Sequence, residues 1–182
     1  MYFRLIPYGL GITLFLLLAV PSPLGSRVFY APEQAKALAF PDADGFKTRT
    51  LVLSPAQVEK VEKLSRATLT SKLVRMQTAW LGEKLLGYFV IDIHNVRTKS
   101  EALLVALDAR GRISKVRVLA FHEPLNYKPV QRWYDAFAGK KSGDTLRVGY
   151  DVDAVSGATL TTRATTTAVR RALAYHKVLF GS

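Results

Sequence analysis

The stretch Ala102–Phe121, ALLVALDARGRISKVRVLAF, decides the fold. Two apolar runs, Ala102–Asp108 and Ile113–Phe121, flank the turn-forming sequence ARGR. In the second run apolar residues alternate with Lys115 and Arg117, which is the period-two pattern of a strand with one face in water. The stretch therefore predicts an antiparallel β-hairpin.

A second hairpin precedes this one in the chain. The runs Leu73–Leu81 and Leu85–Ile93 are rich in strand-forming residues and are separated by a short Gly-Glu-Lys turn. Thr48–Leu53 alternates in the manner of a further strand, and we expect a last short strand at Thr145–Val148. These segments together predict an antiparallel sheet.

Four segments show helical signals. Ser54–Gln57 combines an N-cap serine, a first-turn proline and a glutamine that completes a capping box, so a helix is predicted from there to about Leu64. Shorter helices are expected at Glu33–Ala39 and Pro129–Ala138, and a long one at Thr159–Phe180. The apolar stripe of the long helix consists of Leu160, Ala164, Ala168, Ala172, Tyr175 and Leu179. The predicted fold class is α+β, an antiparallel sheet of two hairpins flanked by helices, with a long C-terminal helix.

The composition excludes several classes of site. The chain has 182 residues, a formal net charge of +12 and no cysteine. Without cysteine it forms no disulfide, no thiolate zinc site and no thioether-linked haem, and it has no thiol nucleophile. No spacing of His, Asp and Glu is typical of metal ligands, and no Ser-His-Asp set can be argued, so we assign no catalytic and no metal residue. The length fits one compact domain.

The N-terminal segment differs from the rest of the chain. After Arg4, Leu5–Val20 contains no charged residue, which is typical of a secretory signal or a short membrane anchor. We therefore divide the chain into residues 1–26, a signal peptide or anchor, and residues 27–182, the folded domain. Because Leu24 is bulky for a cleavage site at Gly25–Ser26, an uncleaved anchor stays open beside a cleaved signal. The domain is expected on the extracytoplasmic (periplasmic) side of the membrane, tethered by this segment.

One short motif carries the candidate chemistry. Asp153–Thr159, DAVSGAT, leads into the long C-terminal helix with small residues that let a ligand approach the backbone closely. The free N–H groups of a helix start favour an anion, and Thr159 would present its hydroxyl to that anion. The same residues also suit a plain helix cap, in which Ser156 satisfies the first turn. The residues alone leave a phosphate site and a cap as alternatives.

The motif resembles the flavin-attachment signature of the FMN-binding domain family. This family includes flavin-carrying subunits of the sodium-pumping NADH:quinone oxidoreductase and of the Rnf complex, and stand-alone exported proteins. Its signature has Asp, two residues, Ser or Thr, Gly, Ala, then Ser or Thr, and DAVSGAT is similar to it at every position. The resemblance implies covalent FMN, esterified through its phosphate to the Thr159 hydroxyl. It also implies a separate flavin transferase that installs the FMN from FAD.

The resemblance extends upstream of the motif. Ser100–Leu119 is similar to the family's core hairpin, and Trp133–Lys141 resembles the helix and turn before the signature. Phe121–Pro124 lies where the family has a His-x-Glu-Thr-Pro-Gly loop near the flavin ring, and the chain then departs from that pattern with Leu125–Tyr127. Ten residues are expected to contact the cofactor on this basis: Ser100, Glu123, Pro124, Asp153, Ser156, Gly157, Ala158, Thr159, Leu160 and Thr161.

Other polar residues have two interpretations each. The segment HNVRTKSE, residues 94–101, either brings Arg97 or Ser100 to the flavin phosphate or ring, or forms a solvated basic loop. His122 either tunes the flavin or is a hydrogen-bonded residue at a strand end, and the second is the commoner role of a lone histidine.

These observations predict an electron carrier more than a stand-alone enzyme, because a flavin passes the electrons while the protein sets its potential and access. The expected partners are the flavin transferase, a membrane redox donor, and an acceptor such as a cytochrome or a quinone-linked complex. Arg163, Arg170 and Lys177 are spaced to form one basic face that docks on anionic lipid or on an acidic cytochrome. A flavin-dependent reductase of a small substrate is the alternative. A basic module that binds nucleic acid or a membrane surface is a weaker one, since no nucleic-acid-binding motif is present.

Overall fold

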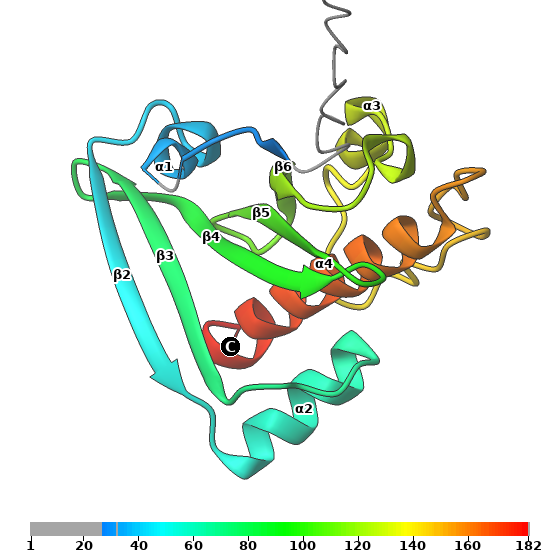
Figure 1. Ribbon diagram of the computed structural model, residues 1–182. Helices are drawn as coiled ribbons and strands as arrows, with labels where there is room; N and C mark the ends of the chain where they lie inside the picture. Colours follow the sequence, from blue (N-terminus) through cyan, green and yellow to red (C-terminus); the bar gives the residue numbers. More distant parts are fainter. Residues whose placement is uncertain (1–26, 32, 182) are drawn as a thin grey trace, which may run out of the picture.

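The computed structural model describes residues 27–31 and 33–181, and the predicted signal or anchor segment 1–26 lies outside them. The described chain is α+β, with a six-stranded antiparallel sheet in the order β1-β6-β5-β4-β3-β2 (Figure 1). The strands are β1 Arg27–Val28, β2 Gly45–Val52, β3 Leu73–Leu81, β4 Lys84–Asn95, β5 Ser100–Asp108 and β6 Ile113–Phe121. From β2 to β6 the strands follow one another across the sheet in chain order, and β1 extends the β6 edge.

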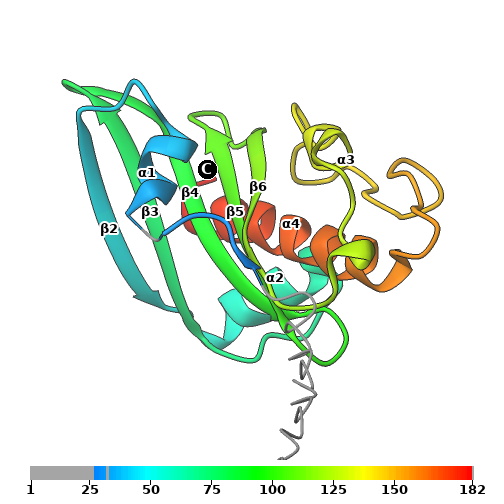
Figure 2. The same ribbon diagram turned by 45° about the horizontal axis from the view of Figure 1, so that its top comes forward.

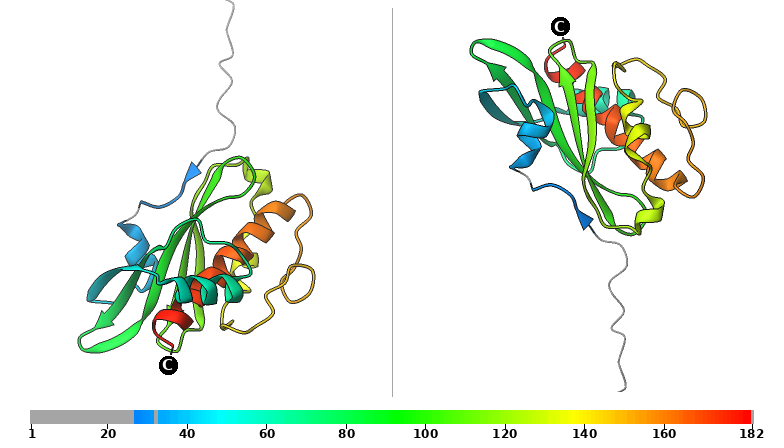
Figure 3. Two further views of the ribbon diagram at one scale, coloured as in Figure 1. Left: turned by 90° about the horizontal axis from the view of Figure 1, so that it is seen from below. Right: turned by 90° about the horizontal axis from the view of Figure 1, so that it is seen from above.

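The helices cover both faces of this sheet. α4 crosses one face with α2 packed beside it, whereas α1 lies on the opposite face (Figures 2 and 3). The helices are α1 Gln34–Ala39, α2 Pro55–Ser65, the 3-10 turn η1 Leu125–Tyr127, α3 Gln131–Asp135 and α4 Thr159–Leu179. Within residues 27–31 and 33–181, no helix has both the length and the apolar character needed to cross a membrane.

Side chains alternate along each strand, and this alternation builds two cores. On β4, Tyr88 and Val90 point into the larger core beneath α4, whereas Phe89 points into a smaller core beneath α1. On β5, Leu103 and Leu104 divide in the same way. Because both faces of the central strands are buried, these strands are almost continuously apolar instead of alternating with polar residues.

The two predicted hairpins are confirmed. β3 pairs with β4 and β5 pairs with β6, both antiparallel, and Gly82 and Gly111 take positive φ angles of 57° and 75° in the connecting turns. The capping box of α2 is also present, because Ser54 Oγ accepts the Gln57 N–H while the Gln57 side chain accepts the Ser54 N–H. β2 is longer than the sequence predicted, and α3 is shorter.

The expected strand at Thr145–Val148 is wrong. The Asp151 carboxylate accepts hydrogen bonds from the backbone N–H groups of Leu146 and Arg147, at 2.7 and 2.5 Å, and so closes a tight turn. Leu146 has a positive φ of 41°, which no strand conformation allows. These two N–H groups are thus bonded to the carboxylate and are not available to pair with a neighbouring strand.

The inward face of α4 also differs from the predicted apolar stripe. Leu160 is 49% exposed, although Ala168, Ala172 and Tyr175 are buried as expected. Near the helix start the buried positions are threonines: Thr161, Thr162, Thr165 and Thr166. Threonine is tolerated there because its hydroxyl finds a hydrogen-bond acceptor inside the protein.

Candidate functional site

α4 begins at Thr159 without a side-chain cap. Its N-cap residue is Ala158, which has no polar side-chain atom, and the alternative of a cap from Ser156 is therefore wrong. The first three N–H groups of the helix have no hydrogen-bond partner among the described residues, and the first capping bond runs from Thr162 N–H to Ala158 C=O at 2.9 Å. Three donors and the positive end of the helix dipole are therefore free to receive an anion.

A cavity of about 220 Å³ opens at this helix start. Its walls come from three parts of the chain: residues 157–161, the end of β4 with Val96 and Arg97, and the segment after β6 with Glu123 and Tyr127. Arg97 brings a positive charge to the same lining. The cavity thus combines backbone donors, a guanidinium and an apolar wall.

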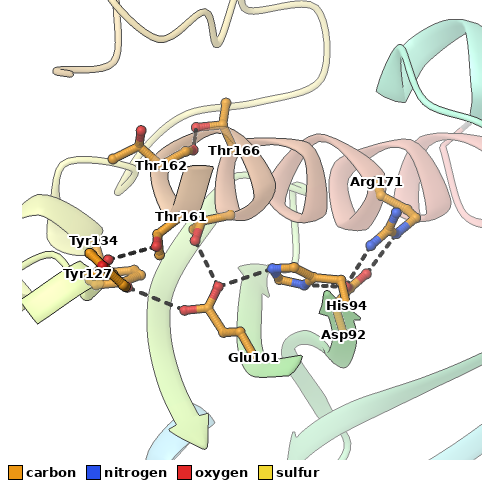
Figure 4. Close-up of polar contacts among 10 residues, drawn as sticks. Asp92, His94, Glu101, Tyr127, Tyr134, Thr161, Thr162, Thr166 and Arg171 are labelled. Carbon is orange, nitrogen blue, oxygen red and sulfur yellow. Dashed lines mark hydrogen bonds and ion pairs between the residues drawn. The ribbon is translucent and has the colours of Figure 1, made fainter. Parts of the chain in front are cut away.

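The threonines of α4, a helix that the structure describes in full, differ in whether their hydroxyls are already bonded (Figure 4). Thr161 donates to the Tyr127 carbonyl at 2.6 Å, and Thr165 donates to the Glu101 carboxylate at 2.9 Å. Three others are bonded within the helix: Thr162, Thr166 and Thr167. The hydroxyl of Thr159 makes no hydrogen bond in the described chain, and its side chain is exposed at the cavity. It is therefore the α4 threonine whose hydroxyl can bind or react without breaking an internal bond.

Glu123 also lines the cavity. It is 4% exposed, and one carboxylate oxygen accepts the backbone N–H groups of Thr98 and Lys99, at 2.7 and 2.8 Å. These bonds, first from Lys99 and then from Thr98, hold the pKa of Glu123 below its ordinary value. The ionised carboxylate thus fixes the loop after β4 beside the cavity and positions Arg97 there.

Six of the ten residues predicted to contact the cofactor line this one cavity: Glu123, Gly157, Ala158, Thr159, Leu160 and Thr161. Gly157 has a φ of +77°, and a Cβ added there would meet nothing within 4 Å. The backbone conformation, not crowding, therefore requires glycine at this position.

The other four predicted residues lie elsewhere. Asp153 and Ser156 line a neighbouring hollow beside α3. Ser100 and Pro124 line neither space. The Ser100 carbonyl accepts the backbone N–H of His122 at 3.0 Å, which agrees with the strand-end interpretation of that histidine.

Two further residues of the cavity lining, Val96 and Tyr127, are absent from the predicted set. Tyr127 ends η1, in the segment where the chain departs from the family pattern. Its carbonyl anchors Thr161, so this departure forms part of the site. The one sequence signal for Tyr127 is its position three residues after Pro124, at the end of the segment that follows the predicted loop. The sequence left Arg97 either near the flavin or in a solvated basic loop, and the structure places it in the lining of the cavity.

A chain of buried charged groups runs beneath α4, next to this site (Figure 4). His94 lies in β4 with Nδ1 2.9 Å from an Asp92 oxygen and Nε2 3.0 Å from a Glu101 oxygen. Arg171 donates to both Asp92 oxygens, at 2.7 and 2.6 Å. Glu101 is fully buried and also accepts the Tyr134 hydroxyl at 3.3 Å. The interpretation of residues 94–101 as a solvated loop is therefore wrong for His94 and Glu101.

His94 is protonated in this arrangement. Both ring nitrogens face carboxylates, and only the imidazolium can donate from both. Burial alone lowers the pKa of His94, but the hydrogen bonds to Asp92 and Glu101 outweigh burial and raise the pKa to about 9. Burial likewise raises the pKa of Asp92, but the bonds from His94 and Arg171 bring it down to about 2. The buried charges are thus paired.

The expected basic face of α4 is incomplete. Arg170 donates from Nε to the Ser65 carbonyl at 2.8 Å and from Nη1 to the Leu146 carbonyl at 2.9 Å. It therefore ties α4 to the end of α2 and to the Leu146 turn. Arg163 and Lys177 remain exposed.

The comparisons with known proteins agree with the site. Residues 101–174 match the family model of the FMN-binding domain, and no curated protein matches the chain. The matched segment includes both Glu123 and Thr159, which line the same cavity. Among the residues that the structure describes, no cluster of His, Asp and Glu could hold a metal ion. Residues 101–174 thus match the FMN-binding domain family, and this match supports FMN binding by the protein.

Proposed function

We propose that this protein is an exported electron carrier whose FMN is attached covalently, through its phosphate, to the Thr159 hydroxyl. The FMN-binding domain supports a flavin-binding electron carrier in general. One observation carries the attachment site: at the start of α4 the Thr159 hydroxyl and the first three N–H groups are all without hydrogen-bond partners in the described chain.

The residues of the cavity fit a phosphate. A phosphodiester keeps one negative charge, which the dipole of α4 stabilises by ~0.3–1 kcal/mol. Arg97 adds an opposite charge to the lining. The negative charge of Glu123 does not oppose binding strongly, because that carboxylate is already committed to the N–H groups of Thr98 and Lys99.

Attachment is a group transfer catalysed by the separate flavin transferase. With FAD as donor, a bond forms between Thr159 Oγ1 and the phosphorus of FMN, and the phosphoanhydride bond to AMP breaks. The hydroxyl proton leaves with AMP, so no electrons are exchanged. The exposed position of Thr159 gives the transferase access to its hydroxyl.

The size of the cavity favours a carrier over an enclosed enzyme site. Its volume of about 220 Å³ is smaller than the ~300–1,000 Å³ that encloses drug-sized ligands, so FMN extends beyond it. Substrate chemistry favours a site that excludes water, whereas electron transfer does not need one. When bound, FMN supplies one- and two-electron transfer. The chain's own residues hold the phosphate and present Val96, Tyr127 and Leu160 as the apolar wall.

The compartment and the partners belong to the same proposal. The uncharged run Leu5–Val20 supports export and tethering on the extracytoplasmic side. A covalent bond suits that location, because a dissociated cofactor would be lost there. The partners are the flavin transferase, a membrane redox donor, and a cytochrome or quinone-linked acceptor. The exposed Arg163 and Lys177 supply positive charge for docking.

Labelling of the full chain tests the attachment site. After co-expression with a flavin transferase, the wild type should gain the mass of FMN less one water and stay fluorescent on a denaturing gel. Thr159→Val keeps the shape and removes the hydroxyl, so both signals should disappear, and Thr159→Ser should keep them. Ser156→Ala is the matched control, because it removes the other exposed hydroxyl of the motif.

A fluorescent Thr159→Val band would refute the attachment site, as would loss of label in Ser156→Ala alone. Location is tested separately. Protease added to intact spheroplasts should digest the domain, and protection from protease would contradict export without affecting the attachment site.

A further inference from the structure

β3 and β4 separate on the side away from their hairpin turn, and a second cavity lies between the start of β3 and the second half of β4. Their last ladder pair is Gln77 with Phe89. Beyond it β3 stays paired with β2 and β4 with β5, so the two facing edges are not bonded to each other. Figure 1 shows β3 leaving β4, with α4 behind the gap. The cavity has a volume of about 230 Å³, and Arg171 and Tyr175 of α4 line it.

The cavity contains hydrogen-bond donors that nothing in the described chain uses. Tyr175 is 8% exposed, and its hydroxyl has no hydrogen-bond partner among the described residues. Burial raises the pKa of Tyr175, so the phenol stays protonated and can donate. Arg171 uses Nε and Nη2 on Asp92, which leaves Nη1 unbonded. Arg75, exposed on β3, also lines the cavity.

The charges and the apolar lining together define the chemistry of a ligand. Arg75 and Arg171 are positive, and Asp92 is the one carboxylate of the lining. Because Asp92 already accepts bonds from Arg171 and His94, an incoming molecule meets donors and a net positive charge. Polar atoms make up most of the exposed lining, but six of the twelve lining residues are apolar: Leu69, Leu73, Val74, Val90, Ile91 and Ile93. This combination fits a small monoanion with an apolar body, whereas the second charge of a phosphate dianion would be repelled by Asp92.

We propose that this cavity is a binding site for a small organic carboxylate. The carboxylate group is received by the Tyr175 hydroxyl and by Nη1 of Arg171, and the apolar body lies against β3 and β4. The volume is below the ~300–1,000 Å³ of pockets for drug-sized ligands, so the ligand is smaller than these. Arg171 and Thr161 are about 15 Å apart along the α4 axis, at 1.5 Å per residue. The site is therefore separate from the cofactor cavity and does not depend on flavin attachment.

Sodium benzoate is a suitable probe, and the full isotope-labelled chain can be titrated with it by NMR. The amide signals of Tyr175 and Val90 should shift and saturate, whereas that of Gly157, in the cofactor cavity, should not. Benzamide has the same shape without the charge and should bind at least about tenfold more weakly, because a neutral amide makes weaker hydrogen bonds with these donors than a carboxylate does. Inorganic phosphate should also bind more weakly than benzoate.

Two variants assign the contacts. Tyr175→Phe keeps the buried ring and should weaken benzoate binding about tenfold, because it removes a charge-assisted hydrogen bond. Arg75→Gln should weaken it less, because that guanidinium is exposed. Tyr150→Phe is the matched control, since Tyr150 is 79% exposed and does not line the cavity, and its affinity should equal the wild type's.

Several outcomes would overturn the proposal. Benzoate shifts that do not saturate, or that centre on Gly157, would remove the site. Equal affinity in Tyr175→Phe and the wild type would exclude the proposed contact. Benzamide binding as tightly as benzoate would show a merely apolar pocket, and tighter binding of phosphate would overturn the carboxylate class.

Discussion

Raising the pH above 6.5 should destabilise the folded protein through His94. The imidazolium lies between two carboxylates, and its side chain is only 11% exposed, so solvent screens it little. Its pKa rises from an ordinary value of 6.5 to about 9, which corresponds to about 3 kcal/mol of folding free energy. Because the pKa is raised by folding, this stability is complete below pH 6.5 and is lost as the pH approaches 9.

The groups that surround His94 determine this effect. Asp92 flanks it on β4 and Glu101 on β5, while Arg171 of α4 and Tyr134 of α3 contact those two carboxylates. Deprotonation would leave one ring nitrogen without a proton against a buried carboxylate. The remaining negative charges would then be only partly compensated by Arg171.

Urea unfolding at a series of pH values measures the effect. With m-values of ~1–3 kcal/mol/M, the wild-type midpoint should fall by about 1–3 M between pH 6.5 and 9, relative to His94→Gln. His176→Gln is the matched control. Burial lowers the pKa of His176, so this residue costs stability as the pH falls and should not change the alkaline limb. Wild-type and His94→Gln curves that run parallel from pH 6.5 to 9 would refute the buried imidazolium.

Three further substitutions have expected outcomes. Glu123→Gln should lower the free energy of unfolding in urea by about 1–3 kcal/mol and slow FMN labelling, because it weakens the hydrogen bonds that hold the Arg97 loop. Unchanged stability would show that Glu123 does not hold this loop. Gly157→Ala should lower the free energy of unfolding by about 1–2 kcal/mol in the same assay, because alanine is strained at a φ of +77°. A much larger loss would mean that the added Cβ contacts neighbouring atoms. Gly87→Ala should give insoluble protein on expression, since the new Cβ would overlap the Leu107 carbonyl oxygen. A soluble, cooperatively folding variant would contradict this contact.

Most of the fold could be predicted because its signals are local. The β3–β4 and β5–β6 hairpins depend on apolar runs around glycine turns, and α2 depends on its capping box. The two-residue β1 carries no such pattern, so pairing with β6 alone defines it. The Thr145–Val148 error has a tertiary cause as well, because Asp151 competes for the backbone donors of that segment.

The candidate site was predictable in part for the same reason. The motif at Asp153–Thr159 is contiguous, so it identifies the helix start from the sequence. The sequence does not show which α4 threonine has an unbonded hydroxyl, because the partners of the others can lie far away in the chain. Thr161, for example, donates to the Tyr127 carbonyl. The pairing of Asp92 with Arg171 joins residues that are 79 positions apart, and no local pattern indicates such a pair.

Beyond Gly87, the alternation of β4 limits how this protein can vary in length. Tyr88, Val90 and Asp92 share the α4 face of the strand, whereas Phe89 and Ile91 pack on the α1 face. One residue inserted between Phe89 and Asp92 would exchange these faces, because the side-chain period is two. The buried carboxylate would then enter an apolar core, and Arg171 would lose its counter-ion. Insertions and deletions among relatives should therefore gather in the Gly82 turn and in the loop before β5, and β4 itself should keep a constant length.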